Sequence, residues 1–262
     1  MSVIFLGSIS IALYACLFIY IWRCLNLGQT MHWLASALCG LAIISHGYLS
    51  YLLIDGGQGQ NLSLFNVFVM TTWLAMCLVG WNLIKHQAHS LLLVSLPIAA
   101  ISILEALVLP SAPPIPNSGD LVNLVHILSG IAAMSILLLA ALQSTLVIYL
   151  DKGLRHHPAS IHPWLGSLQS MERYLIQLLT TGFVLMSVSL FLVLLLPYDL
   201  TSNQVLHKVI LTSVSWLVLA ALMFGRFIKG WRGVFAAKWS LLAVFLLLLG
   251  YFGSKLVVEF LL

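Results

Sequence analysis

Charge is what this sequence has least of. Only 7% of its 262 residues are Asp, Glu, Lys or Arg, whereas 61% are hydrophobic; an ordinary soluble domain carries about 25% charged residues. So few charges exclude a soluble globular domain and predict an integral membrane protein. The formal net charge of +4 is small and dispersed along the chain, so nucleic acid is not expected as a partner.

Cysteine is also scarce, and its spacing excludes two kinds of site. The four cysteines, Cys16, Cys24, Cys39 and Cys77, form no C-x-x-C pair and no C-x-x-C-H motif. Neither a dithiol redox motif nor covalent haem attachment is therefore predicted. The sequence also has no nucleophile–base constellation, phosphate-cradling loop or metal-hydrolase spacing, so we predict that the protein is not an enzyme.

Long apolar runs are what the sequence has in abundance. A membrane-spanning helix needs about 20 apolar residues, and eight runs between turn residues reach that length. The predicted spans are 3–22, 31–54, 63–84, 90–109, 121–150, 171–197, 207–228 and 238–261. The predicted fold is therefore all-α, a polytopic membrane protein forming one transmembrane domain over residues 1–262.

The charges are sorted by connection. Basic residues lie in the first, third, fifth and seventh connections: Arg23, Lys85, Lys152, Arg155, Arg173, Arg226, Lys229, Arg232 and Lys238. The other connections carry Asp55, Asp120 and Asp199. The positive-inside rule then places the basic connections in the cytoplasm and both termini in the periplasm of a bacterial inner membrane. Four prolines within residues 110–120 predict a non-helical cover on the periplasmic side.

Three of the nine histidines fall within or at the start of predicted spans. They are His46 in "LAIISHGYLSYLL", His126 in "LVNLVHILSG" and His207 in "QVLHKVILTSVSW". An ionisable residue inside a span is costly and marks a functional site by default. His46 lies about 12 Å from the periplasmic end of its span, so all three are predicted to border one cavity in the outer half of the bilayer. The alternative is a neutral imidazole that only hydrogen-bonds to a neighbouring helix.

Imidazoles on facing helices at similar depth are a common way for a helical bundle to hold haem iron. Zinc or copper fits less well, because no cysteine or carboxylate stands at matching depth to complete a ligand set. We therefore predict haem b, with His46, His126 and His207 as candidates for the iron ligands.

The last third of the chain resembles the end of known membrane proteins. A tryptophan-containing helix (Trp216) is followed by a basic G-W-R-G loop at residues 230–233 and an aromatic-Phe-Gly element at residues 251–253. Upstream, "QNLSLFNVFVMTTW" is similar to an Asn-led segment that opens a third span. These motifs, in this order, resemble the CcsA/CcmC superfamily of cytochrome c assembly proteins, in its compact YpjD/HemX-type branch. The resemblance implies that His46 and His126 are haem ligands.

One signature of the haem exporters in that superfamily is missing. Their tryptophan-rich segment ends W-D-P-K, whereas residues 205–208 here read V-L-H-K. We therefore expect no apocytochrome-docking surface and no cytochrome c synthase activity. In its place His207 would supply an axial ligand or a propionate contact, Lys208 would pair with a propionate, and Trp216 would stack on the ring. The alternative is that His207 is an interfacial polar residue that caps the seventh helix.

Three functions are weighed against one another. The first is a haem-binding inner-membrane protein of cytochrome c assembly or haem handling, with haem, membrane lipid and other cytochrome-assembly proteins as partners. The second is a small-solute or proton-coupled transporter whose histidines relay protons. The third is a non-catalytic membrane partner protein. The first is favoured because the candidate ligands share one side of the membrane and no broken-helix pair marks a midplane substrate site.

The basic residues around the G-W-R-G loop are expected to fix orientation and contact anionic lipid headgroups. They are Arg226, Lys229, Arg232 and Lys238. The alternative is that they receive a haem propionate or a partner protein.

Overall fold

The computed structural model describes residues 2–28, 33–55, 59–84, 89–109, 113, 120–156, 165–196, 203–253 and 255. Among these residues, eight helices are long and apolar enough to cross a membrane, which confirms the predicted all-α, eight-span class. Lys85, Asp199, most of the proline-rich connection and the end of the last predicted span lie outside the described residues. The helices fall into two compact units, Met1–Asn117 and Ser118–Leu262, and each unit is described by itself.

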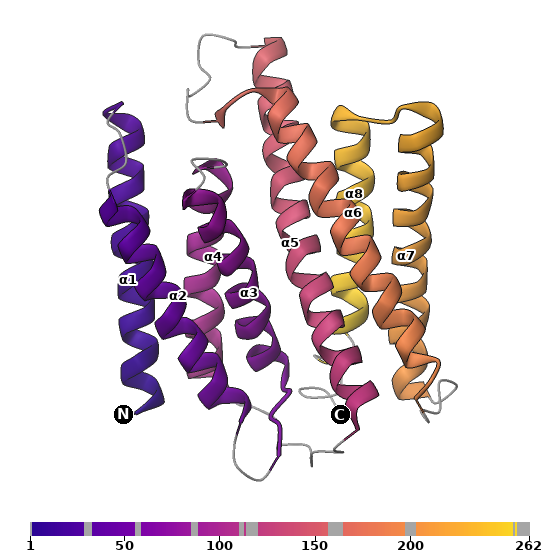
Figure 1. Ribbon diagram of the computed structural model, residues 1–262, viewed down its shortest axis with the longest axis horizontal. Helices are drawn as coiled ribbons and strands as arrows, with labels where there is room; N and C mark the ends of the chain where they lie inside the picture. The colour runs from indigo at the N-terminus through magenta and orange to yellow at the C-terminus, as the bar shows by residue number, and fades with distance from the viewer. Residues whose placement is uncertain are drawn as a thin grey trace. The chain divides into compact units, whose positions relative to one another are not determined.

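The first unit is a ring of four helices. They are α1 (Val3–Asn26), α2 (Trp33–Ile54), α3 (Leu64–Ile84) and α4 (His89–Val108). α1 packs against α2 and α4, and α3 packs against the same two helices (Figure 1). Each helix therefore buries two flanks against neighbours, as in an antiparallel bundle joined by short connections.

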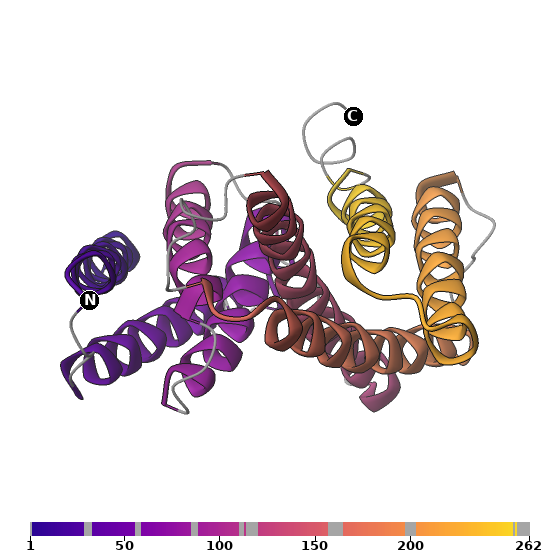
Figure 2. The same ribbon diagram turned by 90° about the horizontal axis from the view of Figure 1, so that it is seen from above.

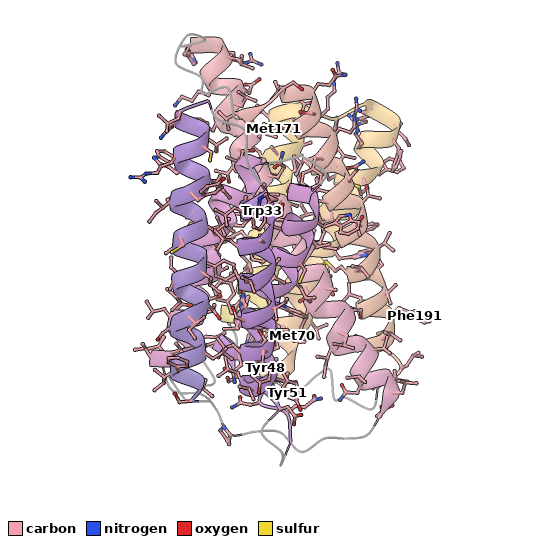
Figure 3. The ribbon with its side chains drawn as sticks, turned by 60° about the vertical axis from the view of Figure 1, so that its left-hand side comes forward. Trp33, Tyr48, Tyr51, Met70, Met171 and Phe191 are labelled. Carbon is pink, nitrogen blue, oxygen red and sulfur yellow. The ribbon has the colours of Figure 1, made fainter. Side chains whose placement is uncertain are left out.

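Exposed aromatic residues lie at both ends of α2. Trp33, the first residue of the helix, is 80% exposed, and Tyr48 and Tyr51 near its other end are also exposed (Figure 3). The 18 steps from Trp33 to Tyr51 correspond to about 27 Å of helix, close to the hydrocarbon thickness of about 30 Å. Trp and Tyr favour the two membrane interfaces, so this spacing is typical of a helix that spans the bilayer.

Close contact between α2 and α3 depends on a glycine. A Cβ atom at Gly47 would lie 2.6 Å from Nε1 of Trp73, and that indole nitrogen donates a hydrogen bond of 3.0 Å to the carbonyl of Ile43. Small residues allow helices to approach closely where lipid provides no hydrophobic driving force. Two hydroxyl pairs join other neighbouring helices: Ser10 with Ser45 at 3.0 Å and Thr72 with Ser102 at 2.7 Å.

The second unit also has four helices in ring order. They are α5 (Leu121–His156), α6 (Leu168–Val193), α7 (Asn203–Lys229) and α8 (Gly233–Leu248), which continues as a π-helix, η3 (Leu249–Gly253). α5 adjoins α6 and α8, and α7 adjoins α8 and, more sparsely, α6. The 36 residues of α5 measure about 54 Å, and the helix projects beyond α7 and α8 at its C-terminal end (Figure 1).

α6 runs obliquely across this unit, from the side of α5 toward α7 (Figures 1 and 2). Glycines set its approach to α5, because a Cβ at Gly182 would lie 2.7 Å from Cγ of Leu137. Nearer the other end of the α5–α6 pair, a Cβ at Gly130 would lie 3.1 Å from Oγ of Ser189. The oblique course means that α6 and α7 meet near one end and diverge toward the other.

Most predicted spans match the observed helices closely. Apart from the C-terminal end of the last span, which lies outside the described residues, predicted and observed ends differ by at most six residues. The largest difference is at α5, which continues to His156 rather than 150. α8 begins at Gly233, five residues before the predicted 238. The tight G-W-R-G turn needs only residues 230–232, so the basic residue Lys238 lies within α8 rather than before it.

Candidate functional site

His46 lies on α2 with its side chain completely buried. Its Nδ1 is 2.8 Å from the hydroxyl oxygen of Tyr14 on α1, and the two rings meet edge to face at a centroid distance of 5.6 Å. The other ring nitrogen, Nε2, is buried and makes no hydrogen bond of good geometry to a described residue, while the backbone of Val69 on α3 interacts with the ring. A buried polar atom left unpaired costs about 1–3 kcal/mol, so Nε2 of His46 is a group for which a functional explanation is needed.

The local sequence holds this pair in place. Tyr14 is itself 1% exposed and lies in the middle of α1, where a phenol must find a polar partner to satisfy its hydroxyl. On the α2 side, Ser50 Oγ donates 2.9 Å to the carbonyl of His46, one turn earlier. The imidazole is thus oriented by a neighbouring helix through Nδ1, while Nε2 makes no hydrogen bond of good geometry within the described chain.

His126 lies in the second turn of α5 and is half-buried. Its Nδ1 is 2.9 Å from the backbone carbonyl oxygen of Ser189 on α6. A carbonyl oxygen only accepts, so this shorter contact favours a proton on Nδ1, which leaves Nε2 with a free lone pair. Ser189 Oγ lies 3.1 Å from the same nitrogen and can share that proton. Ser189 Oγ also donates to the His126 carbonyl at 3.3 Å.

This arrangement is the one that metal-bound histidines usually show. A ligating imidazole almost always donates its other N–H to a carbonyl, carboxylate or water, which fixes the tautomer and the ring orientation. Gly130, one turn after His126, lets α6 approach closely enough to supply the carbonyl. Among the predicted site residues, His126 therefore has the ring nitrogen best prepared for a metal.

His207 and Lys208 are less constrained. His207 is the fifth residue of α7, is exposed, and makes no hydrogen bond to a described residue, while Lys208 is half-buried. Trp216 is nine positions after His207, and nine steps of about 100° each place two side chains on opposite sides of a helix. α7 therefore does not present the two rings on one face.

Trp216 is engaged by α6. Its Nε1 donates 2.8 Å to Oγ of Ser187, and its ring stacks on Phe183 at a centroid distance of 5.6 Å with 24° between the planes. These contacts pin the middle of α7 to the C-terminal half of α6. One face of the indole is thus already covered by an aromatic ring.

The candidate ligands come from different parts of the chain. His46 belongs to the first unit, and His126 and His207 belong to the second. Within the second unit, α5 and α7 are not neighbours in the ring, because α6 and α8 lie between them. In the part of the chain that the structure describes, no three His, Cys, Asp or Glu side chains gather as a metal site. A shared cavity for the three histidines stays a prediction.

Sequence reasoning missed the two groups that orient these imidazoles. Tyr14 was detectable in principle, because "IALYACLF" places a phenol deep inside an apolar span. Ser189 contributes a backbone carbonyl, and a carbonyl leaves no trace in the residue type. Its role depends on which helix lies beside α5.

Comparison with known proteins gives one consistent result. The family model described as "Cytochrome C assembly protein" matches residues 7–262. The chain is 26% identical over 219 residues to "Inner membrane protein YpjD" of Escherichia coli strain K12, covering 83% of each chain. The proteins of that name from strains O6:H1 and O157:H7 match to the same extent. No solved structure matches.

Proposed function

The chain belongs to the cytochrome c assembly protein family, and from this premise we propose that it is a haem-binding inner-membrane protein that acts in cytochrome c assembly or haem handling. The cofactor is haem b, since the sequence has no C-x-x-C-H motif for covalent attachment. Similarity to the inner membrane protein YpjD supports the location.

The observation that carries the proposal is the hydrogen bond from His126 Nδ1 to the Ser189 carbonyl. It leaves Nε2 as the lone-pair nitrogen, which is the form that binds haem iron. His126 is half-buried, so its side chain is not sealed in the helix packing. The chemistry of His126 is therefore compatible with the haem that the family implies.

His46 is the second proposed ligand. Its Nε2 is buried and makes no hydrogen bond of good geometry with the residues described, so iron would compete there only with the backbone of Val69. Tyr14 would then act on Nδ1 as Ser189 acts on His126, holding the ring in one orientation. Bound haem b supplies a redox-active iron; the chain supplies ligands, orientation and an apolar enclosure.

The missing W-D-P-K signature separates this protein from a synthase. Residues 205–208 read V-L-H-K, and His207 there is exposed. We infer that the protein holds or passes on haem without catalysing its attachment. His207 and Lys208 are proposed to contact a haem propionate rather than the iron, since an exposed ring at a helix start is suited to a polar group.

The test is the absorption spectrum of the full-length protein purified from haem-replete cells. We expect a Soret band that shifts on reduction and is lost or altered in His126→Ala and in His46→Ala. Removing a group that only orients a metal ligand costs about 10–100-fold in affinity, so removal of the ligand itself should cost more. The spin state of the oxidised protein reports the number of axial histidines: two give a low-spin spectrum, and one gives a high-spin spectrum.

The matched control is His156→Ala. His156 ends the same helix as His126 and is exposed, about 45 Å away along α5, so its loss should leave the spectrum unchanged. A colourless protein that also fails to bind added haemin would contradict the proposal and favour the transporter or the partner protein. An unchanged spectrum in both His126→Ala and His46→Ala would reject these two ligands.

A further inference from the structure

A pocket of about 720 Å³ opens beside α6 and α7 at the basic end of the second unit. Seven residues line it: Ile176, Thr180, Met223, Arg226, Phe227, Gly230 and Arg232. They come from the first half of α6, the last turns of α7 and the loop that leads into α8. The pocket is remote from His126, which lies at the opposite end of α5 from the basic connections.

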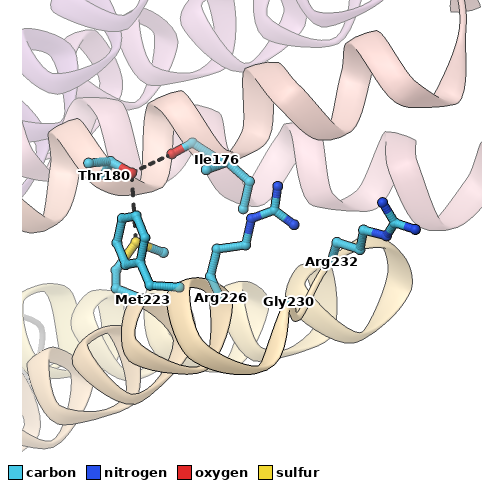
Figure 4. Close-up of a pocket in the computed structure, with 7 residues that line it drawn as sticks. Ile176, Thr180, Met223, Arg226, Gly230 and Arg232 are labelled. Carbon is cyan, nitrogen blue, oxygen red and sulfur yellow. Dashed lines mark hydrogen bonds between the residues drawn. The ribbon is translucent and has the colours of Figure 1, made fainter.

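The pocket follows from the oblique course of α6. α6 and α7 are joined by a hydrogen bond of 2.8 Å from Trp216 Nε1 to Ser187 Oγ. Further along α7, Met223 Sδ accepts a hydrogen bond of 3.7 Å from Thr180 Oγ1. Beyond this point α6 diverges from α7 (Figures 1 and 2). The space between the two helices is then lined by side chains instead of being filled by them (Figure 4).

The lining has two kinds of surface. Ile176, Met223 and Phe227 are apolar, and Phe227 is 80% exposed at the edge. Arg226 and Arg232 add two guanidinium groups; Arg226 reaches from α7 toward α6, and Arg232 projects from the loop (Figure 4). The ligand that matches this lining has an anionic head and an apolar body.

Neither arginine is neutralised within the described residues. Arg226 Nη1 donates 3.2 Å to the carbonyl of Trp231, which fixes the guanidinium without removing its charge. The ion pair present in the described chain joins Arg155 to Asp151 at the end of α5 and involves neither arginine. An acidic group does lie beside the loop, because the carboxylate of Glu172 is against Gly233 at the start of α8, but in the described part of the chain it forms no ion pair with either arginine.

We propose that this pocket binds the phosphate headgroup of an anionic phospholipid, with its acyl chains lying along the apolar lining and the exposed face of α7. Guanidinium groups bind phosphate through paired, charge-assisted hydrogen bonds. The site lies where the last turn of a spanning helix meets its basic loop, which is the depth of lipid phosphates. Phe224, Phe227 and Ile228 expose apolar side chains on the same turns of α7.

The test is native mass spectrometry of the full-length protein released from nanodiscs that contain equal amounts of phosphatidylglycerol and phosphatidylcholine. We expect wild type to retain phosphatidylglycerol in preference. Arg226→Gln and Arg232→Gln should each lower that retention about tenfold, since one lost charge-assisted hydrogen bond corresponds to at least one factor of ten. Arg232 is exposed and makes no hydrogen bond to a described residue, so Arg232→Gln keeps the test valid if Arg226→Gln fails to fold.

Lys152→Gln is the matched control, because Lys152 is an exposed cation near the C-terminal end of α5 that does not line the pocket. It should retain phosphatidylglycerol as wild type does. Equal retention of the two lipids, or an equal loss in Lys152→Gln, would overturn the proposal. Displacement by inorganic phosphate alone would assign the site to a free anion. Loss of haem absorbance in Arg232→Gln, with lipid retention unchanged, would assign it to a propionate.

Discussion

His46 and His126 are both held through Nδ1, but by groups that constrain the imidazole tautomer differently. In each ring Nδ1 is held by a neighbouring helix, through the Tyr14 hydroxyl in one case and the Ser189 carbonyl in the other. The carbonyl permits only one tautomer, whereas the hydroxyl can donate or accept. The carbonyl contact therefore favours a lone pair at Nε2 of His126, whereas the tautomer of His46 depends on whether its Nε2 interacts with the Val69 backbone or with a bound group.

Replacing Tyr14 separates a structural role of His46 from a ligand role. Tyr14→Phe keeps the buried ring and its edge-to-face contact but leaves Nδ1 of His46 without a partner. We expect a loss of about 1–3 kcal/mol in the free energy of unfolding, measured by denaturant titration in detergent. If His46 binds iron, haem affinity should also fall by about 10–100-fold.

Tyr48→Phe is the control for this change. Tyr48 is an exposed tyrosine on the same helix as His46, so loss of its hydroxyl should alter neither stability nor haem content. A Tyr14→Phe protein that is destabilised while its haem affinity is unchanged would limit the His46–Tyr14 pair to a structural role.

The candidate ligands were predictable from the sequence, and the groups that orient them were not. An imidazole inside an apolar run stands out in the sequence alone, as His46 and His126 do. Tyr14 lies 32 residues before His46, and Ser189 lies 63 residues after His126. Such pairs form only once helix adjacency is known. Contacts of this kind also decide that Trp216 faces Phe183.

At the scale of helices, small residues decide which pairs pack closely. α5 and α6 share the most extensive contact in the second unit, and Gly182 lies against Leu137, which is fully buried. α6 and α7 have little contact by comparison and enclose the arginine-lined pocket. α6 is therefore tightly packed against α5 on one side and only loosely packed against α7 on the other.

Adding one methyl group at Gly182 should weaken the α5–α6 seam. In Gly182→Ala the new Cβ would lie 2.7 Å from Leu137 Cγ, and a fully buried leucine has little room to shift. Overpacking of this kind typically costs about 1–3 kcal/mol. A lowered thermal unfolding midpoint in detergent is the expected result.

The same substitution at Gly40 provides the comparison. Nothing lies within 4 Å of a Cβ built at Gly40, and alanine favours a helix over glycine, so Gly40→Ala should be neutral or slightly stabilising. Equal midpoints for the two variants would show that the approach of α6 to α5 does not depend on Gly182.

Helix positions were largely predictable because apolar length alone defines a span. The exceptions arise where polar residues continue a helix beyond the membrane. α5 runs on through Asp151 and Arg155, which pair within one turn at 2.9 Å, so the helix ends at His156. The π-turn of η3 depends instead on packing, since Gly250 lies against Leu211 of α7.

For the whole molecule, the orientation of the helices in the membrane determines which side His126 and the arginine-lined pocket each face. In the second unit, His126 lies near Asp120 at the start of α5, and the arginine-lined pocket lies at the other end of the helices, beside Lys229. If basic connections face the cytoplasm, His126 lies on the periplasmic side and the pocket faces the inner leaflet. The orientation therefore determines which compartment the candidate haem ligand faces and which lipids the pocket meets.

Reporter fusions test this orientation directly. Alkaline phosphatase is active only in the periplasm, and green fluorescent protein fluoresces there poorly when exported unfolded. Fusions after Asp55 and Asp120 should therefore give phosphatase activity without fluorescence, and fusions after Arg155 and Lys229 should give the reverse. The basis is that each membrane crossing inverts the side and that Lys and Arg are retained inside. The opposite pattern would place His126 on the cytoplasmic side and would contradict haem held on the periplasmic side, while leaving the geometry of its hydrogen bond to Ser189 unaffected.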